Sequence, residues 1–311
     1  MKIGILGTGF GAYHASIYQK SKQIDSIIIY GRDEKKRSKI EKEMNIKTTS
    51  QIENIIENPE IDLIDICLPS KLHKKYVIEA LKNGKHVFCE TPVSLTLQDA
   101  LEMKEAEQMY GKKLFINLFI KFERPYEIIH EAVQNNTYGK LNAIHLKRKT
   151  PPLWGDLGLN HIVTNLMIHE LDFVAWLLDH PKNISVVGIQ GKNGQSHVDV
   201  QLQYKNVLVE IQTSSMMPVS YPFTVSYEVV FEKGTIEFVE RCYENQNEIN
   251  LVEYTNEKKE KVEMDQSNCY EKSIKHVLDC CGKDINSSKI SINDAIKSLD
   301  LAMIINEKLK K

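Results

Sequence analysis

The 311-residue chain lacks an excess of charge of either sign, since its 40 Lys and Arg side chains are balanced by 42 Asp and Glu side chains. A formal net charge of −2 at pH 7 gives no basic surface of the kind that binds nucleic acid or an anionic membrane. No apolar run approaches the roughly 20 residues that span a bilayer, and the first residues show no signal-peptide pattern. We therefore expect a small-molecule substrate, with no nucleic-acid or membrane partner.

The sequence also lacks cysteine pairs of the C-x-x-C type. Its six cysteines show no metal-ligand spacing, so we predict no metal site. Cys67 and Cys89 lie in apolar, strand-like runs, where a thiol acts as a small hydrophobe. The adjacent Cys280 and Cys281 leave a redox role open, although their position favours two faces of one helix. This cysteine usage predicts a reduced, cytoplasmic protein.

The sequence begins with a glycine-rich turn. The apolar run at residues 3–6 predicts a buried strand, and Gly7, Gly9 and Ala12 then match the G-x-G-x-x-G/A fingerprint of dinucleotide-binding folds. Gly7 permits a tight turn, Gly9 lets the backbone approach a pyrophosphate, and Ala12 lets the next helix lie close to the sheet. That helix directs free N–H groups and its positive end at the phosphate. The predicted cofactor-binding residues of this loop are Gly7, Thr8, Gly9, Phe10, Gly11 and Ala12.

The end of the second predicted strand, residues 26–30, bears on the choice between NAD and NADP. NAD-binding folds of this type place an acidic side chain there, on the ribose 2′-hydroxyl. Here the position is Gly31, followed by Arg32, while Asp33 is expected to cap the helix over residues 34–44. We predict that Gly31 and Arg32 contact the cofactor, with a slight preference for NADP over NAD. The alternative is that Arg32 is only a solvated loop charge.

Strands and helices alternate along the first 120 residues. Strands are predicted over residues 61–68, 86–89 and 114–119, and helices are predicted to begin at Ser70 and Thr96 as N-caps. This alternation favours an α/β fold with a doubly wound parallel sheet, whose ligands bind at the carboxyl edge of the strands. The other predicted cofactor-binding residues are Leu68, Ser70, His73 and Glu90.

After residue 120 the pattern changes to successive strands with short turns, which is typical of an antiparallel sheet. The expected strands cover residues 184–190, 197–204, 207–213, 223–231 and 235–239, after a strand over 141–149. Helices are expected over residues 125–135, 158–179, 270–281 and 293–310. We place a dinucleotide-binding Rossmann domain at residues 1–119, and a substrate-binding and oligomerisation domain of α+β type at residues 120–311.

One predicted helix carries a candidate for proton transfer. Asn165, His169 and Asp172 are spaced i, i+4 and i+7, so their side chains project broadly in the same direction. Hydride transfer between a substrate carbon and nicotinamide needs a group that exchanges a proton with the substrate oxygen, and an unshifted histidine does so near neutral pH. Because Leu166 and Phe173 share much of this face, periodicity alone favours a packed core histidine.

Several motifs follow one another in a fixed order. They are Gly7-x-Gly9-x-x-Ala12, Leu68-Pro69-Ser70-x-x-His73, Gly84-Lys85-His86-Val87, Glu90-Thr91-Pro92, Lys121-Phe122 and His169-x-x-Asp172. In this order the chain resembles, over nearly its whole length, the Gfo/Idh/MocA family of NAD(P)-dependent oxidoreductases, which includes glucose–fructose oxidoreductase and inositol dehydrogenases. The resemblance implies hydride transfer between the nicotinamide and a sugar, nucleotide-sugar or cyclitol hydroxyl or ketone. It also implies a large, open, mostly antiparallel C-terminal sheet and a homo-oligomer, a dimer or tetramer.

The resemblance further implies that His169 is the catalytic acid/base, against the preference from periodicity. Thr91 stands where the family has a lysine on the reacting hydroxyl, and Asn165 stands where it has an aspartate. Lys121 is the candidate replacement for the missing cation; an ordinary strand-end lysine is the alternative. The predicted catalytic residues are His169, Lys121, Thr91 and Asn165. Two other functions stay open: a reductase of an imine or conjugated bond, and a regulator that binds dinucleotide or sugar without turnover.

Overall fold

The computed structural model describes residues 1–152, 155–244, 246–264, 267–287 and 289–310. The chain forms two compact units, Met1–Phe122 with Ser267–Ile296, and Glu123–Gln266 with Lys297–Lys311. This division differs from the single boundary expected after residue 119, because helix α8 (Cys269–Gly282) belongs to the first unit. A hydrogen bond of 2.7 Å from Ser273 Oγ to Asn117 Oδ1 is one of the contacts that hold α8 there.

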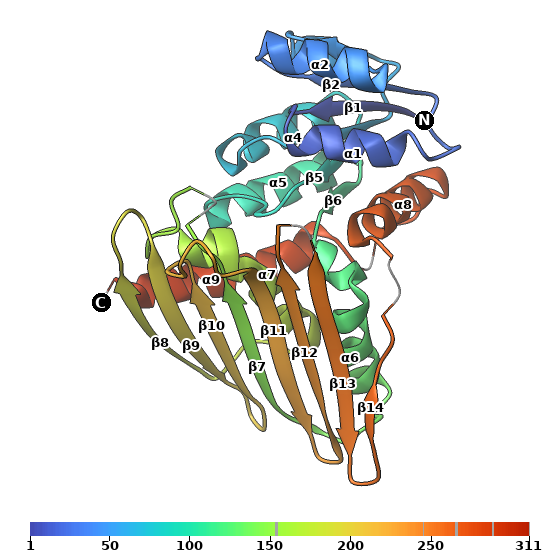
Figure 1. The fold of residues 1–311 in the computed structure, drawn as a ribbon. Helices are drawn as coiled ribbons and strands as arrows, with labels where there is room; N and C mark the ends of the chain where they lie inside the picture. The colour runs from blue at the N-terminus through green and yellow to red at the C-terminus, as the bar shows by residue number, and fades with distance from the viewer. Residues whose placement is uncertain (153–154, 245, 265–266, 288, 311) are drawn as a thin grey trace. The chain divides into compact units, whose positions relative to one another are not determined.

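The first unit contains a six-stranded sheet in the order β3-β2-β1-β4-β5-β6, with every pair parallel (Figure 1). The strands are β1 (Lys2–Leu6), β2 (Ser26–Tyr30), β3 (Lys47–Thr49), β4 (Leu63–Ile66), β5 (His86–Cys89) and β6 (Leu114–Ile116). The strand order reverses between β1 and β4, which is where doubly wound sheets bind ligands at their carboxyl edge. The predicted parallel sheet is confirmed, with β3 as an additional strand.

The helices of the first unit are α1 (Phe10–Tyr18), α2 (Glu34–Met44), α3 (Glu53–Ile56), α4 (His73–Lys82), α5 (Leu97–Tyr110) and α8. Asp33 and Thr96 cap α2 and α5 as predicted, each accepting a hydrogen bond from the backbone N–H three residues on. The prediction for Ser70 is wrong: it begins a 3₁₀ turn, Ser70–Leu72, and α4 follows without a side-chain cap. The strand expected over 114–119 ends at Ile116, because the backbone turns, with Leu118 N donating to Ile116 O.

The second unit contains an eight-stranded sheet in the order β14-β13-β12-β11-β7-β10-β9-β8. The strands are β7 (Leu141–Lys149), β8 (Asn183–Gln190), β9 (Ser196–Gln203), β10 (Leu208–Ser214), β11 (Phe223–Phe231), β12 (Gly234–Cys242), β13 (Asn247–Thr255) and β14 (Lys259–Lys261). Among the described strand pairs, β7 and β10 run parallel and the others antiparallel. The expected large, mostly antiparallel sheet is therefore confirmed.

Helices cover one face of this sheet: α6 (Arg124–Gln134), α7 (Ile168–Leu177) and the later part of α9 (Ile292–Leu309) lie behind it in Figure 1. Tyr126 of α6 packs against Phe173 of α7 and Tyr227 of β11, with ring centroids 4.8 and 5.5 Å apart. The opposite face is lined by polar side chains such as His145, Glu210 and Glu237, and we call it the open face of the sheet.

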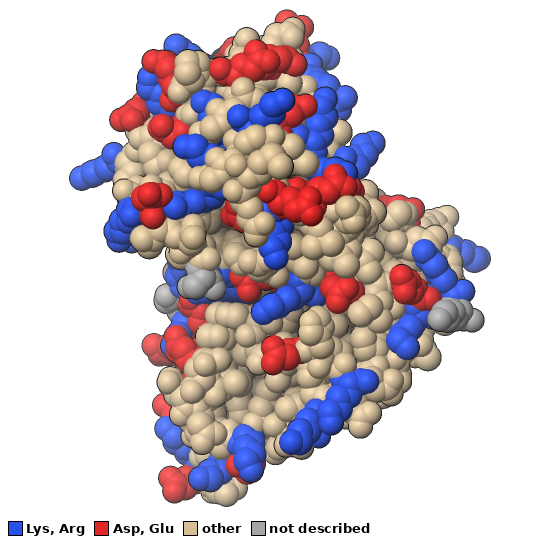
Figure 2. Space-filling view, turned by 180° about the vertical axis from the view of Figure 1, so that it is seen from behind, with Lys and Arg blue, Asp and Glu red and all other residues tan. Residues whose placement is uncertain are grey.

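The surface agrees with the balanced charge of the sequence. Figure 2 shows acidic and basic side chains interspersed over one face of the molecule. Within the described residues, the structure has no helix with both the length and the apolar character that crossing a membrane requires.

Candidate functional site

The glycine-rich turn joins β1 to α1 at the carboxyl edge of the parallel sheet. Gly7 has a φ of +127°, and a Cβ there would lie 2.5 Å from the carbonyl oxygen of Cys67, so the turn requires glycine. A Cβ on Gly9 would meet nothing within 4 Å, which leaves that side of the backbone open to a ligand. Close packing of α1 on β1 depends on Gly11 rather than Ala12, since a Cβ on Gly11 would lie 2.7 Å from Ile5 Cγ2.

The start of α1 fits an anionic ligand. Its N-cap, Gly9, supplies no side-chain hydrogen bond, and its first turn carries no acidic residue. The first N–H groups of a helix have no partner within the helix, and its N-terminus carries a positive partial charge. Phe10, the first residue of α1, is 41% exposed and packs edge-on against Tyr270 of α8. The residues present therefore fit the pyrophosphate of a dinucleotide.

The turn after β2 presents an exposed arginine, and its acidic residue, Asp33, caps the next helix. A Cβ on Gly31 would lie 2.2 Å from Thr8 Cγ2, so an acidic side chain cannot occupy this position unless Thr8 moves. The Asp33 carboxylate caps α2, while Arg32 is exposed. Arg37 fixes the turn, because its guanidinium donates to the carbonyl oxygens of Gly31 and Arg32 at 2.8 and 3.2 Å.

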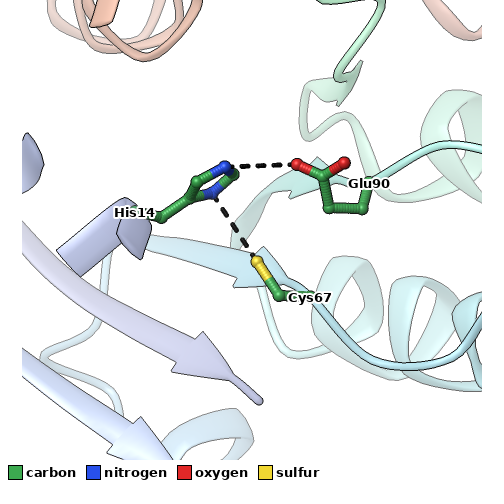
Figure 3. Close-up of side chains that lie close together, drawn as sticks. All are labelled: His14, Cys67 and Glu90. Atoms are coloured by element: carbon green, nitrogen blue, oxygen red, sulfur yellow. Dashed lines mark hydrogen bonds and ion pairs between the residues drawn. The ribbon is translucent and has the colours of Figure 1, made fainter. Parts of the chain in front are cut away.

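Glu90 follows β5 and ends a buried chain of polar groups (Figure 3). Its Oε1 accepts a 2.6 Å hydrogen bond from Asn117 Nδ2 and lies 3.2 Å from His14 Nε2. His14 is fully buried in α1, and its Nδ1 lies 2.8 Å from Asp65 Oδ2 in β4. Burial lowers the pKa of His14, but Asp65 and Glu90 outweigh it and raise the pKa to about 10. His14 is therefore a buried imidazolium between two carboxylates.

His14 and Asp65 were not among the site residues predicted from the sequence. One signal was present: Asp65 is a charged residue inside an otherwise apolar strand, and such residues are almost never fully buried without a partner. Tyr18 Oη and Cys67 Sγ also donate to its carboxylate, at 3.0 and 3.3 Å.

His73 takes a different place from the one expected of a cofactor ligand. It is 1% exposed, its Nε2 lies 2.7 Å from the carbonyl oxygen of Leu68, and its Nδ1 lies 3.1 Å from that of Pro92. Both ring nitrogens are thus directed at backbone oxygens. His73 thus links the loops after β4 and β5 and supports the carboxyl edge of the sheet without facing a ligand through a free ring nitrogen.

Lys121 lies in the 3₁₀ segment Phe119–Phe122 and is 1% exposed. Its ammonium is 3.4 Å from Asp294 Oδ1 in the first turn of α9. Because this contact lies within the first unit, the structure gives Lys121 a structural partner of opposite charge. Its role as a substrate-binding cation stays a prediction.

His169 lies in the first turn of α7, after the π-helical segment Val163–Met167. The extra residue per turn alters the expected i, i+4, i+7 face: Asn165 is exposed, His169 is half-buried and Asp172 is buried. Burial and the Arg148 guanidinium lower the pKa of His169 to about 3, so the expectation of an unshifted histidine is wrong. The ring is therefore neutral at physiological pH, and the lowered pKa makes it a weaker base than an unshifted histidine.

The charge beside His169 belongs to a buried ion pair. Arg148 of β7 donates through Nε to both carboxylate oxygens of Glu170, at 2.7 and 2.9 Å. This pair joins the sheet to α7 directly next to His169, and thereby fixes the turn that carries the imidazole.

Two family models match the chain. Residues 1–118 match the oxidoreductase family with an NAD-binding Rossmann fold, and residues 126–237 match the GFO/IDH/MocA C-terminal domain. The chain belongs to the Gfo/Idh/MocA family. The NAD-binding model spans all of the predicted cofactor-binding residues and Thr91, the C-terminal model spans Asn165 and His169, and Lys121 lies between the two matches.

Individual members of the Gfo/Idh/MocA family match part of the chain. Myo-inositol 2-dehydrogenase of Thermotoga maritima is 31% identical over 186 residues, which are 57% of this chain and 55% of that protein. Inositol 2-dehydrogenase of Pseudomonas syringae is 24% identical over 184 residues, 58% of this chain and 55% of that protein. The chain thus matches about half the length of these curated relatives.

Solved structures match over the whole length. A probable dehydrogenase from Thermotoga maritima has a TM-score of 0.82 at 21% identity, covering 100% of this chain and 97% of that one. UDP-N-acetylglucosamine 3-dehydrogenase from Acidithiobacillus ferrooxidans has a TM-score of 0.82 at 17% identity, covering 100% and 98%. At these identities the likeness establishes the fold, which agrees with the family assignment.

Proposed function

We propose that this protein is an NAD(P)-dependent oxidoreductase that transfers a hydride between nicotinamide and a sugar, nucleotide-sugar or cyclitol hydroxyl or ketone. The observation that carries the proposal is the turn at Gly7–Ala12, whose open backbone and uncapped helix start fit a pyrophosphate. The names of its relatives, myo-inositol 2-dehydrogenase and UDP-N-acetylglucosamine 3-dehydrogenase, support this class of substrate. Thr8, Gly31 and Arg32 would hold the adenosine ribose end.

The bound dinucleotide would supply or accept the hydride, and His169 would exchange the proton. A neutral imidazole accepts the proton of a hydroxyl as its carbon is oxidised, and returns it in the reverse direction. We propose that the Thr91 hydroxyl positions the substrate oxygen through a hydrogen bond. Asn165 would orient the imidazole ring of His169 in the same way. We propose that Lys121 fixes the 3₁₀ segment Phe119–Phe122 through its ion pair with Asp294.

Binding and turnover test the proposal in two steps. Purified protein should change the fluorescence of NADPH or NADH on binding; failure to bind either would overturn the proposal. A panel of inositols, sugars and nucleotide sugars, followed at the nicotinamide absorbance band, then identifies the substrate. Binding of dinucleotide with no turnover of any compound would favour a regulator instead.

The role of His169 is tested with His169→Asn. We expect kcat/KM to fall about 100-fold or more, the usual loss of a general acid/base. His180→Asn is the matched control, because His180 is exposed beyond the end of α7. Since the pKa of His169 is lowered to about 3, the wild-type activity should show no acidic limb near pH 6.5. Equal activity of the two variants would contradict the assignment.

A second candidate is a reductase of an imine or conjugated bond. The ion pair of Lys121 with Asp294 favours it, because such a reaction does not require a cation on a substrate hydroxyl. NADPH oxidation by a cyclic imine or an α,β-unsaturated carbonyl compound, with none of the alcohols oxidised, would support this candidate over the first.

We also propose a cytoplasmic homo-oligomer, either a dimer or a tetramer, formed through the open face of the C-terminal sheet. Cys67, Cys89, Cys242, Cys280 and Cys281 are free thiols, which suits a reducing compartment.

A further inference from the structure

A buried chain of charged groups runs from Asp65 in β4 through His14 in α1 to Glu90 after β5. Both ring nitrogens of His14 face carboxylate oxygens, at 2.8 and 3.2 Å, and such oxygens only accept hydrogen bonds. The contact with Glu90 lacks the alignment of a hydrogen bond and is an ion pair. The ring thus lies between an acidic side chain of β4 and one that follows β5.

A metal ion does not account for the cluster. One ligand atom each of His14, Cys67 and Glu90 lie within 4.8 Å of one another. However, Cys67 Sγ lies 3.6 Å from Nδ1, whereas Glu90 lies beside Nε2, so they flank different nitrogens of the ring (Figure 3). A metal takes the lone pair of one unprotonated nitrogen. One ion therefore cannot replace both contacts, whereas a protonated ring hydrogen-bonds Asp65 on one side and forms an ion pair with Glu90 on the other.

Glu90 is the member of this chain that reaches the surface. Its side chain is 15% exposed, whereas the side chains of His14 and Asp65 are fully buried. Asn117 donates to Oε1 at 2.6 Å, and the backbone N–H of Thr91 donates to Oε2 at 3.3 Å. Ser273 in turn holds the Asn117 amide. The carboxylate is therefore fixed in direction before any ligand arrives.

The strand order would bring this carboxylate to the nicotinamide side of a bound dinucleotide. If the start of α1 holds the pyrophosphate and the end of β2 the adenosine ribose, the nicotinamide half would extend past the strand-order reversal towards β4 and β5. Glu90 stands at the carboxyl end of β5. The residues after it carry no charge that would neutralise it: Thr91, Pro92, Val93 and Ser94.

We propose that Glu90, oriented by His14 and Asn117, stabilises the oxidised form of the bound nicotinamide relative to the reduced form, and so favours oxidation of a substrate hydroxyl. The oxidised ring carries a positive charge and the reduced ring is neutral, so a fixed carboxylate attracts only the former. This inference rests on the proposed dinucleotide-binding function.

The test compares the dissociation constants of NADP⁺ and NADPH, or of NAD⁺ and NADH, for the full-length protein. In Glu90→Gln, which keeps the shape and removes the charge, the ratio of the oxidised to the reduced constant should rise about five- to ten-fold, as expected for one charge acting through protein. Glu79→Gln is the matched control, because the Glu79 side chain is 43% exposed on α4, and it should leave the ratio unchanged.

The outcomes separate this inference from the proposed function. If Glu90→Gln changes both constants by the same factor, Glu90 is only structural and the inference is overturned. If the wild type binds no dinucleotide, the proposed function fails before Glu90 is tested.

A second pair of variants leaves the buried chain intact, in case Glu90→Gln does not fold. Thr91→Lys adds a cation beside the carboxylate and should also raise the ratio, whereas the neutral Thr91→Gln should not. An unchanged ratio in Thr91→Lys would contradict the electrostatic role.

Discussion

Among single residues, Arg32 is the one on which the predicted preference for NADP over NAD depends. It is exposed on a turn where position 31 is glycine and Asp33 caps α2. Arginine binds a phosphate through charge-assisted hydrogen bonds. We expect Arg32→Ala to raise the dissociation constant of NADPH about ten-fold and to leave that of NADH nearly unchanged. Fluorescence titration measures both; an equal effect on the two would remove Arg32 from the 2′ site.

Gly31 and Thr8 allow a matched test in the opposite direction. Gly31→Asp alone places a Cβ 2.2 Å from Thr8 Cγ2 and should weaken binding of both cofactors. Adding Thr8→Ala removes that methyl group and leaves Thr8 Cβ at 3.3 Å. We expect the double variant to bind NADH more tightly than NADPH. The new carboxylate would accept a hydrogen bond from the ribose 2′-hydroxyl of NADH and would repel the 2′-phosphate of NADPH. Retained preference for NADPH would show that the ribose lies elsewhere.

His14 makes stability depend on pH. Its folded pKa of about 10 exceeds the ordinary value of 6.5, so its stabilising contribution is complete below 6.5 and is lost as the pH rises through 10. The facing groups are Asp65, Glu90 and Cys67. Between pH 7 and 9 the free energy of unfolding should fall by up to about 1.4 kcal/mol per pH unit more in the wild type than in His14→Gln. Denaturant titrations at several pH values measure this, and parallel curves for the two proteins would contradict it.

The sequence predicted which residues have a special backbone role better than it predicted which side chains contact one another. Gly7 marks the loop because only glycine suits its backbone geometry, and a sequence shows glycine directly. The partners of His14 and His73 depend on folding, since Asp65 is 51 positions from His14, and the backbone oxygen of Pro92 is 19 positions from His73. Periodicity placed His73 at the correct edge of the sheet, but not the direction of its ring.

At the scale of elements, the start of α9 gives a stability prediction. Ser291 Oγ accepts from Asp294 N, and the Asp294 carboxylate accepts from Ser291 N and Oγ, which forms a reciprocal cap. Ser291→Ala should lower the free energy of unfolding by about 1 kcal/mol. Asp294→Ala should lower it further, because it also removes the partner of Lys121. Thermal or denaturant unfolding measures both, with the exposed Asn293→Ala as control; equal effects of all three would contradict the cap.

The elements themselves were largely predictable, because their patterns are local. Apolar runs identified most strands, and Asp33 and Thr96 identified helix starts. The π-helical turn at Val163–Met167 was not predictable, because one extra residue in a turn barely disturbs a 3.6-residue period. The strand β3, Lys47–Thr49, lacks an apolar run. The parallel pairing of β7 with β10 requires a crossover that no local pattern shows.

At the scale of the whole molecule, the sequence indicated two sheets but not the return of the chain to the first unit. The hydrogen bond between Ser273 and Asn117 joins residues 156 positions apart. The helical pattern of α8 shows an apolar face, but not which sheet that face covers. Long-range packing, rather than propensity, therefore decides which unit a late helix joins.

The open face of the C-terminal sheet is the proposed surface between copies of the chain. It carries acidic and basic side chains side by side: a Glu210 oxygen lies 2.9 Å from His145 Nδ1, and Lys147 lies two residues further along β7 on the same face. A self-complementary surface of this kind pairs each cation with an acid of the second copy across a two-fold axis. Helices cover the other face within the unit, so this face is the one available for association (Figure 1).

Val239 lies in register with Ser226 and Asn250 on this open face, so a charge there would meet the second copy. We expect the wild type to have the mass of a dimer or tetramer in light scattering, and Val239→Glu to shift the mass towards the monomer, because a buried, unpaired carboxylate opposes association. Val219→Glu makes the same change in a 78% exposed loop outside the sheet and should keep the wild-type mass. An oligomer that survives Val239→Glu would place the interface on another surface, and a monomeric wild type would exclude the assembly.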